Sequence, residues 1–382
     1  NGCVGPTSTA TVLVNPTPHA VATPSSQTVC SGIAMSNIVL TGAVSGTTYT
    51  WTRNNTATVT GMGASGSGTP IAGTLTNTTT APVTVTFTIT PTANGCVGPT
   101  TTATVLVNPT PNAVATPSSQ TICSANPITA IVLSGNVTGT TYTWSRNNTA
   151  TVTGIAASGT GNISGTLTNT TTAPVTVTFT ITPSANGCTG PAITATVLVN
   201  PTPNAVATPS SQTICTTIPP TAITTIALSG AVSGTTYSWT RNNTATVTGI
   251  AASGTGNIAG TLSNTTGSPV TVTFTITPTA NGCVGPTTTA TVLVNPINTI
   301  TLTSAAGTNN QQLCMEAALT TITYTTTWAT GATFSGLPAG VNGIWASTGV
   351  NTGLVTINGT VPNTVGTWNY TVTLTGGCGN VT

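Results

Sequence analysis

One stretch recurs three times and constrains the fold of the whole chain. Residues 83–99 read VTVTFTITPTANGCVGP, and nearly the same letters return at residues 175–191 and 270–286. In the first copy, Val, Phe and Ile alternate with Thr, so the apolar side chains lie on one face of an extended strand. This pattern is typical of an antiparallel strand with one face in a core and one in water. The sequence therefore predicts a tandem array of β-rich units.

A second alternating stretch follows each copy. Residues 100–107 contain TTATVLV after a short turn that begins Asn-Gly, and two alternating runs around such a turn predict a hairpin. Further short strands are expected in the first repeat, and the Gly/Ser run before Thr69 is expected to be a loop. About seven strands in a unit of this size indicate a β-sandwich. The predicted fold class is all-β, a tandem array of immunoglobulin-like β-sandwich domains. Before the hairpin, the first repeat is expected to have one strand that ends at Cys30 and four more at residues 38–40, 47–55, 56–61 and 71–79.

The cysteines of the hairpin turns give the length of one repeat. Cys3, Cys96, Cys188 and Cys283 are 93, 92 and 95 residues apart. A unit of that length can bury a modest core of its own, unlike the shorter repeats of solenoids. The predicted domains are residues 1–16, the last strand of an upstream or partner domain; three immunoglobulin-like repeats at 17–109, 110–201 and 202–296; and a divergent immunoglobulin- or cadherin-like domain at 297–382.

The first and last segments are predicted to be incomplete domains. Residues 1–16 match the closing turn and last strand of a repeat, and residues 297–382 stop where that strand should begin. A sandwich without its last strand exposes an apolar groove and a sheet edge. Either the sequence is part of a longer chain, or a strand of another subunit completes the fourth domain. The candidate donor residues are Val12, Leu13 and Val14.

Charge is nearly absent from the chain. Four residues are charged, and there is one histidine, His19. General acid–base catalysis, carboxylate metal sites and phosphate clamps need groups that the sequence lacks, so no catalytic residue, cofactor or metal site is predicted. A net charge of +2 excludes the basic footprint of nucleic-acid binding, and no run of 18 apolar residues predicts a membrane span. The charged residues are Arg53, Arg146, Arg241 and Glu316.

Nine cysteines predict disulfides and an oxidising, extracellular compartment. The favoured pairing joins cysteines within a unit, at spacings of 66, 65, 68 and 64 residues, and leaves Cys3 unpaired. A rival pairing crosses each linker. A third skips one unit, such as Cys30 to Cys188, because the two cysteines of one sandwich would lie at opposite poles. The favoured pairs are Cys30/Cys96, Cys123/Cys188, Cys215/Cys283 and Cys314/Cys378; the rivals are Cys3/Cys30, Cys96/Cys123, Cys188/Cys215 and Cys283/Cys314.

The tryptophans are predicted to be core residues. Trp51, Trp144 and Trp239 occupy the same position in three repeats, in mid-strand and on the same face as a tyrosine, and Trp328 stands in the fourth. The alternative is a sugar-stacking surface, for which Trp345 and Trp368 are the candidates. The three arginines follow the first three tryptophans by two residues and are expected to donate to loop carbonyls rather than to bind an anion.

These repeated motifs resemble a known family. Units containing QTVC or QTIC, GTTYTW or GTTYSW, VTVTFTITP and NGCVGP or NGCTGP are similar to the PKD-like, immunoglobulin-like tandem domains of secreted surface adhesins of Bacteroidota, including those of the gliding-motility type. The fourth unit, with FSGLPAGV and GTWNYTVTL, resembles the immunoglobulin- or cadherin-like repeats of the same proteins. The resemblance implies export to the cell surface by type IX secretion.

Repetition and the near absence of reactive groups favour a non-enzymatic structural protein. The predicted function is a component of a bacterial surface or extracellular filament or adhesin stalk, assembled by strand donation between subunits or continuing as a longer chain. The alternative is a spacer or carbohydrate-binding array of a secreted polysaccharide-degrading enzyme, with surface glycans as partners.

Overall fold

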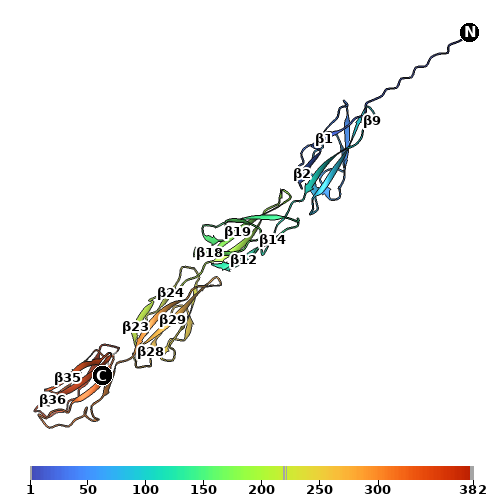
Figure 1. Ribbon diagram of the computed structural model, residues 1–382. Helices are drawn as coiled ribbons and strands as arrows, with labels where there is room; N and C mark the ends of the chain where they lie inside the picture. Colours follow the sequence, from blue (N-terminus) through green and yellow to red (C-terminus); the bar gives the residue numbers. More distant parts are fainter. Residues whose placement is uncertain (1, 218–219, 221, 379–382) are drawn as a thin grey trace. The chain divides into compact units, whose positions relative to one another are not determined.

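A computed structural model describes residues 2–217, 220 and 222–378 (Figure 1). Asn1 and residues 379–382, which belong to the first and last predicted domains, lie outside the described residues. The described residues form strands and no helix, which confirms the predicted all-β fold class. The chain divides into two compact units, Asn1–Asn200 and Pro201–Thr382, and each contains two sandwich domains.

The main sheet of the first repeat brings its early and late strands together. The strand order is β2-β10-β8-β4-β6, with β9 paired to β8. β10 runs antiparallel to β8 and parallel to β2. The second layer consists of the pairs β1-β3 and β5-β7. The strands are β1 (Val21–Thr23), β2 (Ser26–Cys30), β3 (Val39–Thr41), β4 (Thr48–Arg53), β5 (Val59–Thr60), β6 (Ser65–Ser67), β7 (Thr76–Asn77), β8 (Val83–Ala93), β9 (Cys96–Val97) and β10 (Thr101–Asn108).

The second repeat has the same main sheet, in the order β12-β21-β19-β15-β17, with β20 on β19. Its second layer contains β11-β14 and β13-β18-β16. The strands are β11 (Val114–Thr116), β12 (Ser119–Cys123), β13 (Asn126–Pro127), β14 (Val132–Ser134), β15 (Thr141–Arg146), β16 (Val152–Gly154), β17 (Ser158–Thr160), β18 (Thr166–Asn169), β19 (Val175–Ala185), β20 (Cys188–Thr189) and β21 (Ile193–Asn200).

The third repeat follows the same plan, in the order β23-β31-β29-β25-β27, with β30 on β29 and the pairs β22-β24 and β26-β28. The strands are β22 (Val206–Thr208), β23 (Ser211–Cys215), β24 (Ala227–Ser229), β25 (Thr236–Arg241), β26 (Val247–Gly249), β27 (Ser253–Thr255), β28 (Leu262–Asn264), β29 (Val270–Ala280), β30 (Cys283–Val284) and β31 (Thr288–Asn295).

The alternating strand supplies the core of each repeat. In β8, Val85, Phe87 and Ile89 are fully buried, whereas the intervening threonines are at least partly exposed. Burying an apolar side chain of this size stabilises the fold by about 1.5–3 kcal/mol. Because Trp51 and Phe87 lie on the same side of the sheet, their rings meet edge to face at a centroid distance of 5.5 Å. The same pair recurs as Trp144–Phe179 and Trp239–Phe274.

The Gly/Ser run that was expected to be a loop forms the edge strand β6. Gly66 lies opposite Trp51 in the β4–β6 register. A Cβ atom at Gly66 would be 2.3 Å from Cζ2 of the Trp51 ring, so only glycine lets the edge strand approach the indole this closely. The prediction of a loop was wrong because glycine here permits side-chain packing rather than flexibility.

The fourth domain has a different sheet arrangement. One sheet has the order β32-β33-β36-β35, and the other consists of β34 and β37. Leu374 and Val372 of β37 are buried in its core. The strands are β32 (Thr299–Leu302), β33 (Ile322–Thr327), β34 (Gly331–Ser335), β35 (Val341–Gly349), β36 (Thr352–Gly359) and β37 (Thr371–Thr375).

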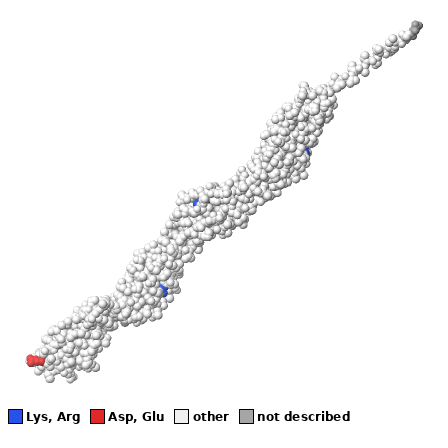
Figure 2. Space-filling model, viewed as in Figure 1, with Lys and Arg blue, Asp and Glu red and all other residues white. Residues whose placement is uncertain are grey.

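Charged side chains are sparse on the visible face of the molecule (Figure 2). Most side-chain hydrogen bonds are therefore made by Thr, Ser, Asn and Gln rather than by charged groups. The Asn and Gln side chains recur at matching positions of the repeats, where they bind backbone groups.

Candidate functional site: disulfide junctions and an open strand position

A disulfide joins the first two repeats. Cys30, the last residue of β2, is bonded to Cys188 in the closing hairpin of the second repeat, with Cα atoms 5.6 Å apart. Cys188 is 1% exposed. The bond spans 158 residues of sequence, so it fastens one sandwich to the next rather than closing a loop inside one.

A buried asparagine supports this junction. Asn108 lies opposite Cys30 in the parallel β2–β10 register and is 4% exposed. Its Nδ2 donates to the backbone oxygen of Asn186, 2.7 Å away, in the turn before Cys188. Asn186 and Gly187 have φ values of 51° and 77°, the left-handed conformation that an Asn-Gly hairpin turn requires. The amide therefore holds the turn that presents Cys188 to Cys30.

The third and fourth domains are joined in the same way. Cys215 at the end of β23 is bonded to Cys378, with Cα atoms 4.9 Å apart. Asn298, which is 1% exposed, donates from Nδ2 to Gly376 O at 2.8 Å. Its Oδ1 accepts from the Cys378 backbone N–H at 3.1 Å. The junction thus again combines a disulfide with a buried asparagine side chain.

Trp328 belongs to this junction and not to the core. It is half-buried, and its Nε1 donates to Gly267 O of the third repeat at 3.0 Å. The prediction that Trp328 is a core aromatic was wrong: the residue follows β33 with φ of 63°, and its indole N–H is bonded to the third repeat instead. Trp144 and Trp239, by contrast, are 9% and 7% exposed, and Trp51 is half-buried against the core of the first repeat.

The favoured pairing of cysteines within a repeat was wrong, and so was the pairing across linkers. Cys30 lies where β10 ends, whereas Cys96 follows β8, which reaches the point where β10 begins. The eight residues of β10 separate these poles by about 23 Å, too far for a disulfide whose Cα atoms lie within about 7 Å. The structure instead has the bond from Cys30 to Cys188, which was the third pairing considered: it passes over Cys96 and joins Cys30 to the next repeat.

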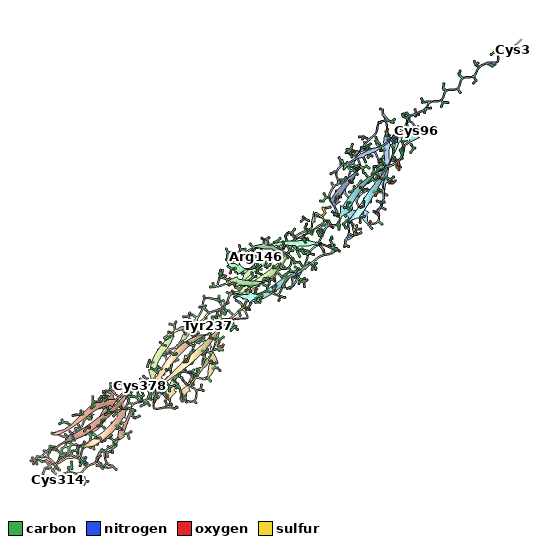
Figure 3. The ribbon with its side chains drawn as sticks, viewed as in Figure 1. Cys3, Cys96, Arg146, Tyr237, Cys314 and Cys378 are labelled. Carbon is green, nitrogen blue, oxygen red and sulfur yellow. A yellow bond between two sulfur atoms is a disulfide. The ribbon has the colours of Figure 1, made fainter. Side chains whose placement is uncertain are left out.

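The other cysteines are in two states. Cys123 and Cys283 are each disulfide-bonded. Cys3, Cys96 and Cys314 are free; Cys3 and Cys314 are exposed, and Cys96 is half-exposed. In the fourth domain, Cys314 and Cys378 lie at opposite ends (Figure 3), which is why their predicted pairing is wrong.

The fourth domain holds a strand position open. In the first repeat, Gln27 fixes β2 by two bonds of 2.8 Å with the backbone of Ser36. Gln311 makes the equivalent pair with Thr320, at 2.7 and 2.9 Å, and like Gln27 it stands three residues before a cysteine. Residues 311–314 therefore occupy the place of β2, although they form no strand. In the described residues, β37 pairs with β34 alone, so its other edge is unpaired. A strand between that edge and residues 311–314 would have the place that β10 has between β8 and β2 in the first repeat.

The N-terminal segment carries the strand that fits such a place. Residues 9–15 have the same letters as residues 102–108 of β10, TATVLVN. They form no strand here, and Val12, Leu13 and Val14 are 86%, 85% and 85% exposed. Asn15 donates from Nδ2 to Asn94 O at 3.0 Å, the same bond that Asn108 makes with Asn186.

The arginines bind loop carbonyls. Arg146 donates from Nε to Ile155 O at 2.8 Å and from Nη1 to Val152 O at 3.0 Å, and Arg53 and Arg241 repeat this pattern in their own domains. Burial lowers the pKa of all three guanidinium groups from the ordinary value. Each arginine thus fixes the loop before an edge strand, as expected from the sequence.

The described part of the chain has neither a metal-binding cluster of side chains nor a membrane-spanning helix. There, no three His, Cys, Asp or Glu side chains gather in a group suited to a metal ion. Among residues 2–217, 220 and 222–378, no helix has the length and the apolar character needed to cross a membrane.

Comparison with known families assigns the repeats. Residues 27–111, 120–203 and 212–298 match the PKD-like domain. The chain belongs to the PKD-like domain family. The PKD-like repeats begin their match at β2, β12 and β23, the strands that end in the cysteines of the junctions. Tandem repeats of this immunoglobulin-like type with disulfides suggest a structural, spacer or adhesive part of an extracellular protein.

Solved structures with similar domains include mouse cadherin-23 repeats EC22–24, with 13% identity and a TM-score of 0.36 over 74% of this chain and 99% of that chain. The titin I-band fragment I67–I69 has 8% identity and a TM-score of 0.41 over 74% and 99%. The protocadherin γB4 extracellular domain has 13% identity and a TM-score of 0.31 over 96% and 66%. The sequence has no significant match among curated proteins.

The asparagine and glutamine anchors are functional residues that sequence reasoning missed. Their signal is present in the repeats: a Gln three residues before each cysteine of the first strand, and an Asn-Pro after each TVLV. Recurrence alone could not assign their partners, because those partners are backbone atoms: nine residues away for Gln27 and in the turn of another repeat for Asn108.

Proposed function

We propose that this PKD-like array is a non-enzymatic structural component of an extracellular filament or adhesin stalk on a bacterial surface. The observation that carries the proposal is the bond from Cys30 to Cys188, which joins neighbouring domains covalently instead of stiffening one domain. An array that only spaces two ends apart needs a linker between its domains. A covalent bond in addition to the linker supports a role in bearing tension.

The disulfides shorten the path that tension takes through the chain. A pull on the first repeat passes along β2 to Cys30 and crosses directly to Cys188, so the residues between the two cysteines carry no load. The bond from Cys215 to Cys378 does the same in the second unit. The sandwich cores are therefore protected from stretching as long as the disulfides are intact.

The strand arrangement resists force in a second way. In the first repeat, β2 lies near the start of the domain and pairs in parallel with β10, which lies near its end. Once the disulfide is reduced, tension between the two ends of the repeat loads all five registered residue pairs of β2 and β10 together, rather than opening them one at a time. The third repeat has the same parallel pairing of β23 with β31.

The alternative of a glycan-binding array has weaker support. Of its two aromatic candidates, Trp345 packs against the core of the fourth domain, and its Nε1 donates to Thr326 Oγ1 at 2.9 Å. Trp368 is 39% exposed and stands alone as a stacking surface. A single exposed indole does not provide the platform that this function needs.

Single-molecule stretching of the full chain, held at its two ends, tests the proposal. The two disulfide loops span 158 and 163 residues and do not overlap. At about 3.4 Å per extended residue, reduction should add roughly 1,000 Å to the extension before rupture. Equal extension with and without reductant would contradict a load-bearing role for the junctions.

A further inference from the structure

We propose that the fourth domain of one copy accepts residues 9–15 of a second copy as its last strand, and that Cys314 of the first copy then forms a disulfide with Cys96 of the second. This inference rests on the proposed structural function and names the partner: another molecule of the same chain.

The acceptor is the position between residues 311–314 and the unpaired edge of β37. On one side, Gln311 holds residues 311–314 where β2 lies in the first repeat. On the other side, β37 has a free edge in the described residues. Leu313 and Met315 beside this place are 39% and 54% exposed. An edge strand flanked by exposed apolar side chains is a template for strand addition.

The donor has the residues that such a place needs. In β10, Ala103, Val105 and Val107 are fully buried, and the identical letters at Ala10, Val12 and Val14 are exposed in the N-terminal segment. Inserting residues 9–15 would therefore bury three apolar side chains that now face solvent. The alternation is the one that an internal last strand has in three repeats.

The register of the donated strand follows from the first repeat. There, Asn108 lies opposite Cys30, and Val107 lies opposite Val29. Applied to the fourth domain, this register places Asn15 of the incoming copy opposite Cys314 and Val14 opposite Leu313. An apolar residue thus meets an apolar residue, and asparagine meets cysteine as it does at an existing junction.

The same asparagine brings the second cysteine to this place. Asn15 already holds the Asn94 turn by the bond that Asn108 uses to hold the Asn186 turn. Cys96 follows Asn94 by two residues, as Cys188 follows Asn186. Cys188 is bonded to Cys30 through this arrangement, whereas Cys96 and Cys314 are free. The geometry therefore makes Cys96 and Cys314 the two halves of one further junction, on different copies.

Forming this junction is an oxidation of two thiols, and glutathione disulfide is a suitable oxidant. The Cys314 thiolate attacks one sulfur of glutathione disulfide and releases one glutathione thiolate, which leaves a mixed disulfide. The Cys96 thiolate of the incoming copy then attacks the Cys314 sulfur and releases the second glutathione. One disulfide is reduced to two thiols, and two protein thiols become one disulfide.

The experiment incubates the full chain with reduced and oxidised glutathione. Non-reducing electrophoresis should show a ladder of covalent oligomers, and mass spectrometry of the digested ladder should find a peptide pair joined through Cys96 and Cys314. Cys314→Ser should remove the ladder but leave noncovalent oligomers in size-exclusion chromatography with light scattering. Cys3→Ser, at an exposed cysteine that the junction does not use, is the matched control and should keep the ladder.

A donor variant separates strand insertion from the disulfide. Val12 corresponds to Val105, which is fully buried in β10. Val12→Arg should therefore abolish both the covalent and the noncovalent oligomers. Val4→Arg, at a residue that is 93% exposed, should abolish neither. Because both positions lie outside the folded sandwiches, unchanged thermal unfolding of the monomer verifies that the variants fold. A ladder that survives Cys314→Ser, linkage through Cys3, or a chain that stays monomeric would overturn the inference. Stretching of the monomer would still test the load-bearing function independently.

Discussion

Cys30 and Cys188 belong to different sandwiches, yet their Cα atoms are 5.6 Å apart and their sulfur atoms are bonded. Cys96, the cysteine of the same repeat as Cys30, lies at the other pole of its sheet. The disulfides Cys30–Cys188 and Cys215–Cys378 therefore each join neighbouring domains, and the junction between two domains is as much a structural element as a strand.

Removal of this bond should destabilise two repeats at once. In the chain-entropy account, a loop of 158 residues contributes about 5 kcal/mol to the free energy of unfolding. Cys30→Ser is therefore expected to lower the guanidinium midpoints of the first and second repeats. The measurement is equilibrium unfolding followed by tryptophan fluorescence. Cys3→Ser is the control, and an unchanged unfolding curve for Cys30→Ser would contradict the prediction.

The buried junction asparagine should matter independently of the disulfide. Asn108→Ala removes the bond to Asn186 O and leaves a backbone acceptor unpaired, which costs about 1–3 kcal/mol. The variant should also slow reformation of the Cys30–Cys188 bond after reduction, because the turn that carries Cys188 is no longer held. Trapping free thiols during reoxidation measures this rate, and a rate equal to that of the unaltered chain would be the contrary result.

The contact between tryptophan and glycine should tolerate no side chain. A Cβ at Gly254 would lie 2.3 Å from Cζ2 of Trp239, so Gly254→Ala is expected to lower the stability of the third repeat by about 1–3 kcal/mol. Gly267→Ala in the same repeat meets no atom within 4 Å and is the matched control. Thermal denaturation monitored by circular dichroism compares the two, and equal melting temperatures would show that the ring is loosely packed.

The fourth domain should lose stability in alkali. Burial and the 2.7 Å hydrogen bond with Tyr324 raise the pKa of Tyr370 above its ordinary value of 10.0. The folded state therefore holds this proton more tightly than the unfolded state does. Its contribution is complete below about pH 10 and falls as the pH rises above that value. Tyr370→Phe should flatten this alkaline decline in a series of melting curves, and a decline unaffected by the substitution would assign it to another group.

The sequence predicted the sandwich because its signal is local. Alternation of Val, Phe and Ile with Thr along 83–90 determines which side chains enter the core, and the Asn-Gly turn determines where the strand reverses. Neither property depends on the rest of the chain. The core position of Trp144 followed from the same parity.

The disulfide pairing could not be predicted, because it depends on which pole of the sheet each cysteine occupies. Spacing along the chain gives no information about poles, and the parallel pairing of β2 with β10, which decides the matter, joins residues 78 positions apart. Trp328 was misassigned for a related reason: its partner, Gly267, belongs to another domain. Contacts between repeats leave no periodic signal within a repeat.

Whether neighbouring domains are joined covalently is tested by mapping the disulfides of the purified chain by mass spectrometry, after digestion without reduction and with free thiols blocked. We expect peptides joined as Cys30–Cys188 and Cys215–Cys378, with Cys96 carrying the blocking group in the monomer. Peptides joined as Cys30–Cys96 or Cys314–Cys378 would show that each domain is closed on itself, and the covalent junctions between repeats would then not exist.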